Sequence, residues 1–253
     1  MQTLAVIPAR LGATRLPRKP LRLLGGAPLV FRVWERVRQM AVADRVVVAT
    51  DSEEVAASIL SHGGEVAMTR SDHPSGTDRV AEVAARREFS AYETIVNVQG
   101  DEPFVSGAAV RGAADLVRSR RFPLATVGVF GDVSILDEPN VVKVVCADDG
   151  RALYFSRARM PFLRDPADRP LLATVVRQHI GVYAYAREAL RAWVALPVHP
   201  LERIERLEQL RPLAAGMPIG VYMIDAPLAA GVDTEDDLRR ANERWSELHT
   251  GRS

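Results

Sequence analysis

Short apolar runs alternate with amphipathic patterns along the first half of the chain. The pattern predicts strands at residues 4–7, 45–50, 65–68 and 94–98, where apolar or β-branched residues cluster. It predicts helices at 28–40, 77–87 and about 107–120, and Asp51 with Glu54 indicates a capping box that opens a further helix ending near Gly63. Strands and helices that alternate with short connections favour an α/β fold with a mixed, mostly parallel sheet and helices on both faces.

The second half of the chain has a different character. Strands at 141–146 and 152–155 flank a turn at 147–150 and predict a hairpin, and further strands are predicted at 179–185 and 219–224. Helices are predicted at 200–213 and from Thr234 to about Trp245, and the Pro-containing segment 163–172 is predicted to be a mobile loop. We expect one domain over residues 1–253, with a smaller hairpin and dimerisation lobe at roughly 139–200.

Composition narrows the class of protein. The chain has 253 residues, of which 47% are hydrophobic and 26% charged, which is typical of a folded globular protein. A net charge of +1 gives no overall field that would attract nucleic acid or an anionic membrane. No apolar run approaches the roughly 20 residues of a membrane span, and no signal-peptide layout opens the chain. With a single cysteine, Cys146, we expect a cytoplasmic protein without disulfides or membrane insertion.

Four cations gather in the loop that follows the first predicted strand. Arg10, Arg15, Arg18 and Lys19 lie in this loop beside Gly12, and such a group suits a polyanion such as a nucleoside triphosphate. The loop lacks the Gly-Lys-Ser/Thr ending of a Walker loop, and it is not a Gly-x-Gly-x-x-Gly fingerprint. The alternative is a solvated basic loop.

Two carboxylates occupy places that suit a metal. Asp101 follows the predicted buried strand 94–98, and Asp233 follows an apolar run near the last helix. Ligands of open α/β sheets bind beyond the carboxyl ends of strands, and two aspartates with phosphate oxygens and waters would hold Mg²⁺. The alternatives are a surface loop acid at Asp101 and a helix cap at Asp233.

Two further polar groups could bind a ligand. The bend from Ser71 to Arg79 offers hydroxyls and backbone N–H groups that could read a base edge, although it could equally be a capped loop.

Side chains alternate between the two faces of a strand, so Arg177, His179 and Tyr183 are expected on one face of the same strand. A helix over 200–213 would place a second polar set on one face, formed by Glu205, Glu208 and Gln209. With Arg157 and His179 this set could bind a carboxylated, polyhydroxylated ligand, whereas a structural histidine and a solvated helix face are the alternatives.

A series of short motifs runs in order through nearly the whole chain. The motifs are Ile7-Pro-Ala-Arg, Thr14-Arg-Leu-Pro, Lys19-Pro-Leu, Ala49-Thr-Asp, Ser75-Gly-Thr, Val96-Asn-Val-Gln-Gly-Asp-Glu-Pro, Val142-Lys-Val, Leu153-Tyr-Phe-Ser-Arg, His179-Ile-Gly-Val-Tyr, Pro200-Leu-Glu, Leu207-Glu-Gln-Leu-Arg and Gly231-Val-Asp-Thr. This ordered set resembles the 3-deoxy-manno-octulosonate cytidylyltransferases, or CMP-Kdo synthetases. The chain departs from the family at Arg18, where the family loop usually has glycine.

The resemblance implies a fold of the nucleotide-diphosphosugar-transferase type, a homodimer and Mg²⁺. The implied reaction joins CTP and Kdo into CMP-Kdo and pyrophosphate for lipopolysaccharide-type surface glycans. The resemblance implies catalytic roles for Lys19, Asp101 and Asp233, with the two aspartates as metal ligands. The CTP-binding residues would be Pro8, Ala9, Arg10, Thr14, Arg15, Lys19, Ser75, Gly76, Thr77, Arg79, Gln99 and Asp101. The sugar-binding residues would be Gln99, Arg157, His179, Tyr183, Glu205, Glu208 and Gln209.

Other functions share parts of this pattern. A cytidylyltransferase for another 2-keto sugar acid, such as 8-amino-Kdo or a sialate, would use the same motifs. A GT-A-type glycosyltransferase would share the sheet, but it usually carries an Asp-x-Asp motif, which Gln99-Gly-Asp-Glu-Pro does not provide. A nucleotide-sensing protein without catalytic activity would not need Asp101 and Asp233 together.

Overall fold

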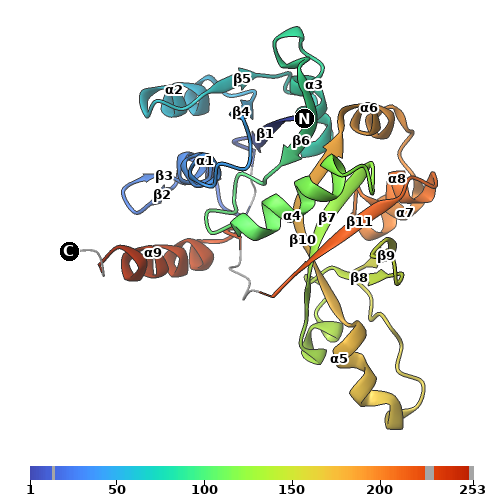
Figure 1. The fold of residues 1–253 in the computed structure, drawn as a ribbon. Coiled ribbons are helices and arrows are strands. Elements are labelled where there is room, and N and C mark those ends of the chain that lie inside the picture. The colour runs from blue at the N-terminus through green and yellow to red at the C-terminus, as the bar shows by residue number, and fades with distance from the viewer. Residues whose placement is uncertain (13–14, 226–230, 251–253) are drawn as a thin grey trace. The chain divides into compact units, whose positions relative to one another are not determined.

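The chain forms two compact units. The structure is a computed structural model that describes residues 1–12, 15–225 and 231–250 (Figure 1). The first unit comprises Gln2–Gly107 and Leu228–Ser253, and the second comprises Met1 and Ala108–Pro227. Each unit is described by itself.

A parallel sheet forms the centre of the first unit. Its strands are β1 (Gln2–Ala9), β4 (Arg45–Thr50), β5 (Val66–Met68) and β6 (Tyr92–Asn97), and a small antiparallel hairpin joins β2 (Leu23–Leu24) to β3 (Ala27–Pro28). Strand β1 pairs with β4 on one side and β6 on the other, and β4 pairs with β5, all in parallel. Seven of the eight residues of β1 are buried, which fits a strand covered on both faces.

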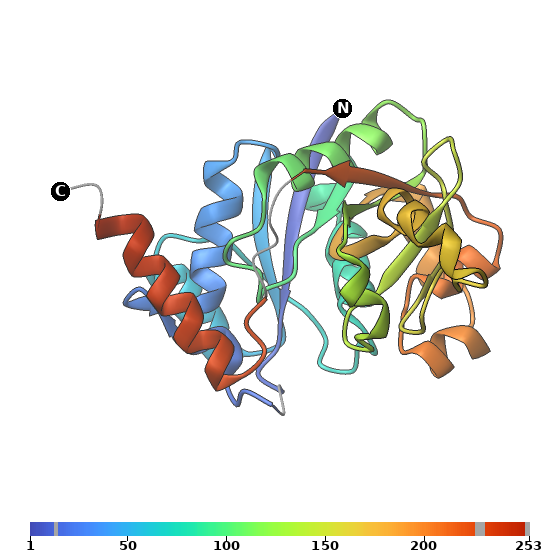
Figure 2. The same cartoon turned by 90° about the horizontal axis from the view of Figure 1, so that it is seen from below.

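Helices connect these strands. The helices of the first unit are α1 (Leu29–Gln39), α2 (Glu53–Ser61), α3 (Gly76–Ala84) and α9 (Glu235–Thr250), with short 3-10 helices η1 (Lys19–Leu21) and η2 (Arg87–Phe89). The chain passes from β1 to β4 and β5 and then returns to β6 on the far side of β1. Right-handed crossovers then put α1 and α3 on opposite faces, as Figure 2 shows. The order of strands therefore reverses between β1 and β6, which is where open α/β sheets bind ligands.

The caps of two helices test the sequence prediction. Helix α2 is capped by Ser52, whose Oγ accepts from the backbone N of Val55 at 3.3 Å, so the prediction of Asp51 as the cap is wrong by one residue. Asp51 lies instead 3.3 Å from the guanidinium of Arg79. Helix α9 begins as predicted, because Thr234 Oγ1 and Asp237 Oδ2 each accept from the other residue's backbone N.

The second unit combines parallel and antiparallel pairing. Its strands are β7 (Leu124–Phe130), β8 (Lys143–Cys146), β9 (Ala152–Ser156), β10 (Arg177–Ala186) and β11 (Ile219–Ile224). Strand β7 pairs in parallel with β11 and antiparallel with β10, whereas β8 pairs antiparallel with β9 and β10. The β8–β9 hairpin confirms the sequence prediction. Strand β7 was not predicted from the sequence.

The helical segments of the second unit include some that were not predicted, among them α6 (Arg187–Ala195), and two predicted segments differ from the structure. The helical segments are α4 (Gly107–Arg118), η3 (Val133–Asp137), η4 (Pro166–Leu171), α5 (Leu172–Val175), α6, α7 (Pro200–Glu205) and α8 (Leu210–Ala214). The segment 163–172 contains η4, and its Leu163 and Leu172 pack with Leu136 and Val176, so it is a structured segment. The predicted helix over 200–213 is broken at Arg206, whose φ of 56° is left-handed. Among the residues that the structure describes, no helix combines the length and apolar character that crossing a membrane requires.

Candidate active site

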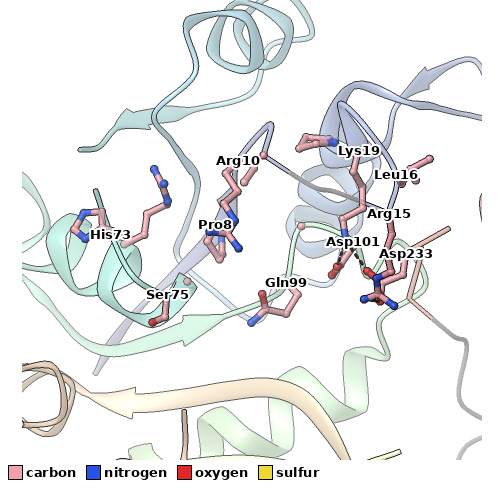
Figure 3. A pocket seen from close by; sticks show the side chains of 16 residues that line it. Pro8, Arg10, Arg15, Leu16, Lys19, His73, Ser75, Gln99, Asp101 and Asp233 are labelled. Carbon is pink, nitrogen blue, oxygen red and sulfur yellow. Dashed lines mark hydrogen bonds and ion pairs between the residues drawn. The ribbon is translucent and has the colours of Figure 1, made fainter. Parts of the chain in front are cut away.

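A cavity of about 320 Å³ opens in the first unit beside the residues that follow β1 and β6 (Figure 3). It is lined by Pro8, Ala9, Arg10, Gly12, Arg15, Leu16, Lys19, Pro20, His73, Ser75, Gly76, Arg79, Gln99, Gly100, Asp101 and Asp233. Most of the residues predicted to bind CTP are among them. Thr77 is buried in the first turn of α3 and is not part of the lining, and Thr14 lies outside the described residues.

The side chain of Leu16 anchors the cationic loop in an apolar cluster of the first unit. Leu16 is fully buried and packs in one cluster with Leu24 and Leu29 and with Val232 and Leu238. Arg10, Arg15 and Lys19 line the cavity, but Arg18 does not. The Arg18 guanidinium pairs with Glu54 instead. Three of the four predicted cations therefore belong to the site.

Lys19 joins the two aspartates that lie far apart in the sequence. Its Nζ donates to Asp101 Oδ2 at 2.5 Å and to Asp233 Oδ1 at 2.9 Å, and the Arg15 guanidinium lies 3.1 Å from Asp233 Oδ2. Burial alone would lower the pKa of Lys19, but the Asp101 and Asp233 carboxylates outweigh it and hold that pKa above its ordinary value. The approach of the two segments is fixed by the backbone, because Val232 N donates to Asp101 O at 2.9 Å.

The arrangement around Lys19 fits a divalent cation. Two carboxylates already share one positive group, and Mg²⁺ prefers a small number of carboxylate ligands together with substrate phosphates. Across the described part of the chain, no cluster of three or more acidic, histidine or cysteine side chains could hold a metal. A phosphorylated substrate and water would supply the remaining ligands of Mg²⁺.

Glu102 is a residue of this site that the sequence reasoning did not single out. Its pKa is raised to about 8, first by burial and then by the nearby Asp101 and Asp233 carboxylates. Glu102 is therefore mostly protonated at neutral pH and adds little negative charge to the site. Its Oε1 lies so near Gly231 that a Cβ on that glycine would be 3.0 Å away.

Gly100 permits the close approach of the loops after β1 and β6. A Cβ on Gly100 would lie 2.9 Å from the carbonyl oxygen of Pro8, a distance that real side chains do not tolerate. The glycine thus lets Gln99 and Asp101 reach the cavity beside Pro8 and Ala9.

The end of the cavity near α3 holds rigid polar side chains. Ser75 caps α3, where its Oγ accepts from Asp78 N at 3.3 Å. The Arg79 side chain is only 4% exposed and is fixed by Thr69 Oγ1 and by Asp51. His73 also lines the cavity, and its Nε2 lies 2.5 Å from Glu82 Oε2. His73 was missed as a site residue, although it lies inside the predicted base-reading bend.

The predicted sugar residues other than Gln99 belong to the second unit. Arg157 is held by Glu205: its backbone N donates to Glu205 Oε2 at 2.9 Å and its Nε donates to Glu205 O at 3.0 Å. The buried Lys143 supports the same segment, because its Nζ donates to the carbonyls of Glu138, Val141 and Arg157. These contacts fix the Arg157 backbone and one edge of its guanidinium.

His179 is a neutral residue rather than a second cation. Burial lowers the pKa of His179 to about 3, and its Nε2 is 2.9 Å from Thr126 Oγ1. The ring of Tyr183 lies 5.5 Å from that of His179, although the pairing of β10 with β7 shifts register between Ile180 and Tyr183. Burial also raises the pKa of Tyr183 well above its ordinary value. Neither side chain is charged at neutral pH, so Arg157 would provide the positive charge for a ligand carboxylate.

The polar residues after α7 do not share a helix face. Glu205 ends α7, and Glu208 and Gln209 follow in the turn before α8. The prediction that these three residues share one face of a continuous helix is therefore wrong. Gln209 is 2% exposed, and within the described residues its Nε2 has no hydrogen-bond partner.

The comparisons with known proteins define the class. A family model described as Cytidylyltransferase matches residues 4–219, and the chain belongs to this family. Among its relatives are proteins named 3-deoxy-manno-octulosonate cytidylyltransferase. The one from Gemmatimonas aurantiaca is 63% identical over 100% of this chain and 98% of its own length. The one from Herminiimonas arsenicoxydans is 48% identical over 98% of this chain and 100% of its own length.

A solved structure agrees with the fold. It is a CMP:2-keto-3-deoxy-manno-octonic acid synthetase complexed with CTP, 36% identical to this chain, with a TM-score of 0.90. The match covers 98% of this chain and 100% of that one. The expected fold class is thereby confirmed.

Proposed function

We propose that this protein activates 3-deoxy-D-manno-octulosonate with CTP and releases CMP-Kdo and pyrophosphate. The observation that carries the proposal is the meeting of Arg10, Arg15 and Lys19 with Asp101 and Asp233 in one cavity beside β1 and β6. Such a group of charges suits a triphosphate and a metal together. The names of the relatives and the CTP complex of the structural neighbour support the choice of nucleotide and sugar.

In this proposal the cationic loop binds the triphosphate. Arg10, Arg15 and Lys19 neutralise phosphate charge, and backbone N–H groups near Gly12 approach the oxygens. Thr14 of the same loop would join them. Asp101 and Asp233 would hold Mg²⁺, which when bound would offset phosphate charge and lower the pKa of the attacking hydroxyl.

The chemistry is an in-line transfer of a cytidylyl group. The anomeric oxygen of the sugar forms a bond to the α-phosphorus, the bond from that phosphorus to the α–β bridging oxygen breaks, and the hydroxyl proton is lost to solvent. Pyrophosphate leaves with the electron pair of the broken bond. Such a transfer depends on position and charge neutralisation rather than on a covalent nucleophile, so Lys19 acts most strongly as negative charge grows on the leaving pyrophosphate.

The sugar acid would be bound by the remaining predicted residues. Within the second unit, Arg157 would pair with its carboxylate, while neutral His179 and Tyr183 and the polar Glu205, Glu208 and Gln209 would bond its hydroxyls. We also propose that the enzyme is a cytoplasmic homodimer that serves lipopolysaccharide-type glycan synthesis.

Pyrophosphate release tests this function. The enzyme should release pyrophosphate from CTP with Kdo and Mg²⁺, and much less with UTP, ATP or GTP. A panel of Kdo, 8-amino-Kdo and a sialate then identifies the sugar. A higher kcat/KM for 8-amino-Kdo or for the sialate would reassign the sugar, and no release with any 2-keto sugar acid would overturn the proposal.

A further inference from the structure

His73 occupies the end of the cavity away from the charged groups. In Figure 3, His73 and Ser75 lie on one side, while Lys19, Asp101 and Asp233 lie on the other. The His73 side chain is only 5% exposed, so it lies against the cavity wall rather than in solvent. A nucleoside triphosphate with its phosphates at the charged end would place its base toward His73.

Glu82 determines which nitrogen of the His73 ring carries the proton. Its carboxylate lies next to His73 Nε2 at 2.5 Å, and it also accepts from Arg70 N and from the Arg86 guanidinium, each at 3.0 Å. Burial alone would raise the pKa of Glu82, but these hydrogen bonds lower it to about 2. An ionised carboxylate can only accept, so Nε2 carries the proton of the pair.

The other ring nitrogen is then an acceptor. When Nε2 holds the proton of a neutral imidazole, Nδ1 presents a lone pair and cannot donate. No described residue forms a hydrogen bond with His73 Nδ1. Cytosine carries an exocyclic amine, which donates, at the position where uracil carries a carbonyl oxygen, which accepts.

We propose that His73 Nδ1 accepts from the exocyclic amine of cytosine, and that Glu82 is the positioning residue that keeps this nitrogen an acceptor. The inference rests on the proposed function, because it names the residue that selects the base at the same site. A uracil carbonyl facing Nδ1 would leave two acceptors opposed, and the unsatisfied pair would disfavour UTP.

The test compares CTP with UTP in variants of the pair. Kinetics are measured at about pH 8.5. His73→Phe should lower kcat/KM for CTP about tenfold or more while changing that for UTP less than about threefold. Glu82→Leu should reduce the same CTP:UTP ratio, since it removes the acceptor that holds the ring proton on Nε2 and leaves that proton free to move to Nδ1. His73→Asn, whose amide oxygen can take the place of Nδ1, should recover part of the preference.

Asp72→Asn is the matched control. It changes a carboxylate in the same bend that is 72% exposed and pairs only with Arg70 among the described residues, so its CTP:UTP ratio should equal that of the parent. Thermal unfolding of each variant checks folding, and the Glu82 variant carries the test if His73→Phe does not fold.

Three results would overturn the inference. An equal loss for CTP and UTP would make His73 a structural residue, and an unchanged ratio in both His73 variants would exclude base reading. If the CTP:UTP ratio is preserved but the preference for CTP over dCTP changes, His73 contacts the ribose rather than the base. Failure of the proposed function is distinct, because the parent enzyme itself would then release no pyrophosphate from CTP with any sugar acid.

Discussion

Lys19 Nζ lies 2.5 Å from Asp101 Oδ2, in a position that a divalent cation bound to the same carboxylates would have to share. The ammonium also contacts Asp233 at 2.9 Å, so it neutralises both carboxylates of the candidate metal pair. Two carboxylates held this close repel each other without a positive group between them. We therefore expect Lys19 to yield this place to Mg²⁺ and to turn toward the phosphates.

Lys19→Ala should separate the role of Lys19 in neutralising the two aspartates from its role toward the phosphates. We expect kcat to fall by about 10²-fold or more, because a point cation stabilises the charge that grows on the departing pyrophosphate, while CTP binding weakens much less. Without nucleotide, the variant should bind Mn²⁺ more tightly than the parent, as measured by electron paramagnetic resonance. Arg22→Ala is the control, because Arg22 pairs with Glu235 and does not line the cavity. A kcat within about threefold of the parent would make Lys19 a surface cation without a catalytic role.

Asp101 and Asp233 should act as one unit. Asp101→Asn and Asp233→Asn each preserve shape but remove half of the pair's charge, so each should abolish most of the activity while the protein stays folded. The double variant should lose little more than the worse single variant, because groups that share one metal are not additive. Steady-state kinetics and Mn²⁺ binding across all four proteins measure this coupling. Losses that multiply would assign the two aspartates separate roles.

Gly100→Ala should strain the junction between the loops after β1 and β6. The new Cβ would meet the Pro8 carbonyl at 2.9 Å, so the loops must separate, and we expect a loss of about 1–3 kcal/mol in the free energy of unfolding. The KM for CTP should rise as well, since Gln99 and Asp101 flank the glycine. Gly12→Ala is the control for stability, because no described atom lies within 4 Å of a Cβ there. Equal stability of the two variants in denaturant titrations would contradict the close approach.

The residues that line the cavity were largely predictable from the sequence because many of them follow strands. Arg10 follows β1 and Asp101 follows β6, and parallel strands bring their carboxyl ends to one edge of a sheet. His73 and Glu102 were not predicted, since their roles depend on long-range contacts with Glu82 and Asp233 that no local pattern reveals.

The second unit was less predictable for equally physical reasons. The helix prediction over 200–213 assumed unbroken periodicity, but Arg206 adopts a left-handed conformation that its side chain gives no reason to expect. The face predicted for Arg177, His179 and Tyr183 assumed strict alternation along β10, which the register shift interrupts.

His179→Gln should change how stability depends on pH. The folded-state pKa of His179 is about 3, below the ordinary value of 6.5, so between these values the unfolded chain binds a proton that the folded protein does not. The contribution of His179 to stability is therefore present above about pH 6.5 and declines as the pH falls toward 3, with a slope of up to about 1.4 kcal/mol per pH unit. The glutamine variant should show a correspondingly shallower decline in urea titrations between pH 6.5 and 4. His249→Gln, at an exposed site, should keep the parent slope. An unchanged slope in His179→Gln would mean that His179 titrates normally.

Arg18 occupies a backbone position that favours glycine. Its φ of 57° lies in the left-handed region, where a residue with a Cβ costs about 1 kcal/mol or more relative to glycine. The resembled family usually has glycine at this position, and glycine adopts a left-handed φ readily. Among the described residues, the Arg18 side chain forms an exposed ion pair with Glu54, which is worth at most about 1 kcal/mol.

A comparison of Arg18→Gly with Arg18→Ala therefore measures how much the left-handed backbone at residue 18 costs in folding stability. Both variants remove the ion pair with Glu54, but only glycine relieves the strain of the left-handed φ. We expect Arg18→Gly to be more stable than Arg18→Ala by up to about 1 kcal/mol, since the greater freedom of glycine in the unfolded chain offsets part of the gain. Arg18→Gly should also keep the kcat and the KM for CTP of the parent, because Arg18 does not line the cavity. Denaturant titrations and steady-state kinetics measure both effects. An alanine variant as stable as the glycine variant would show that the loop adopts another conformation, and a large loss of activity in both would bring Arg18 into the triphosphate site.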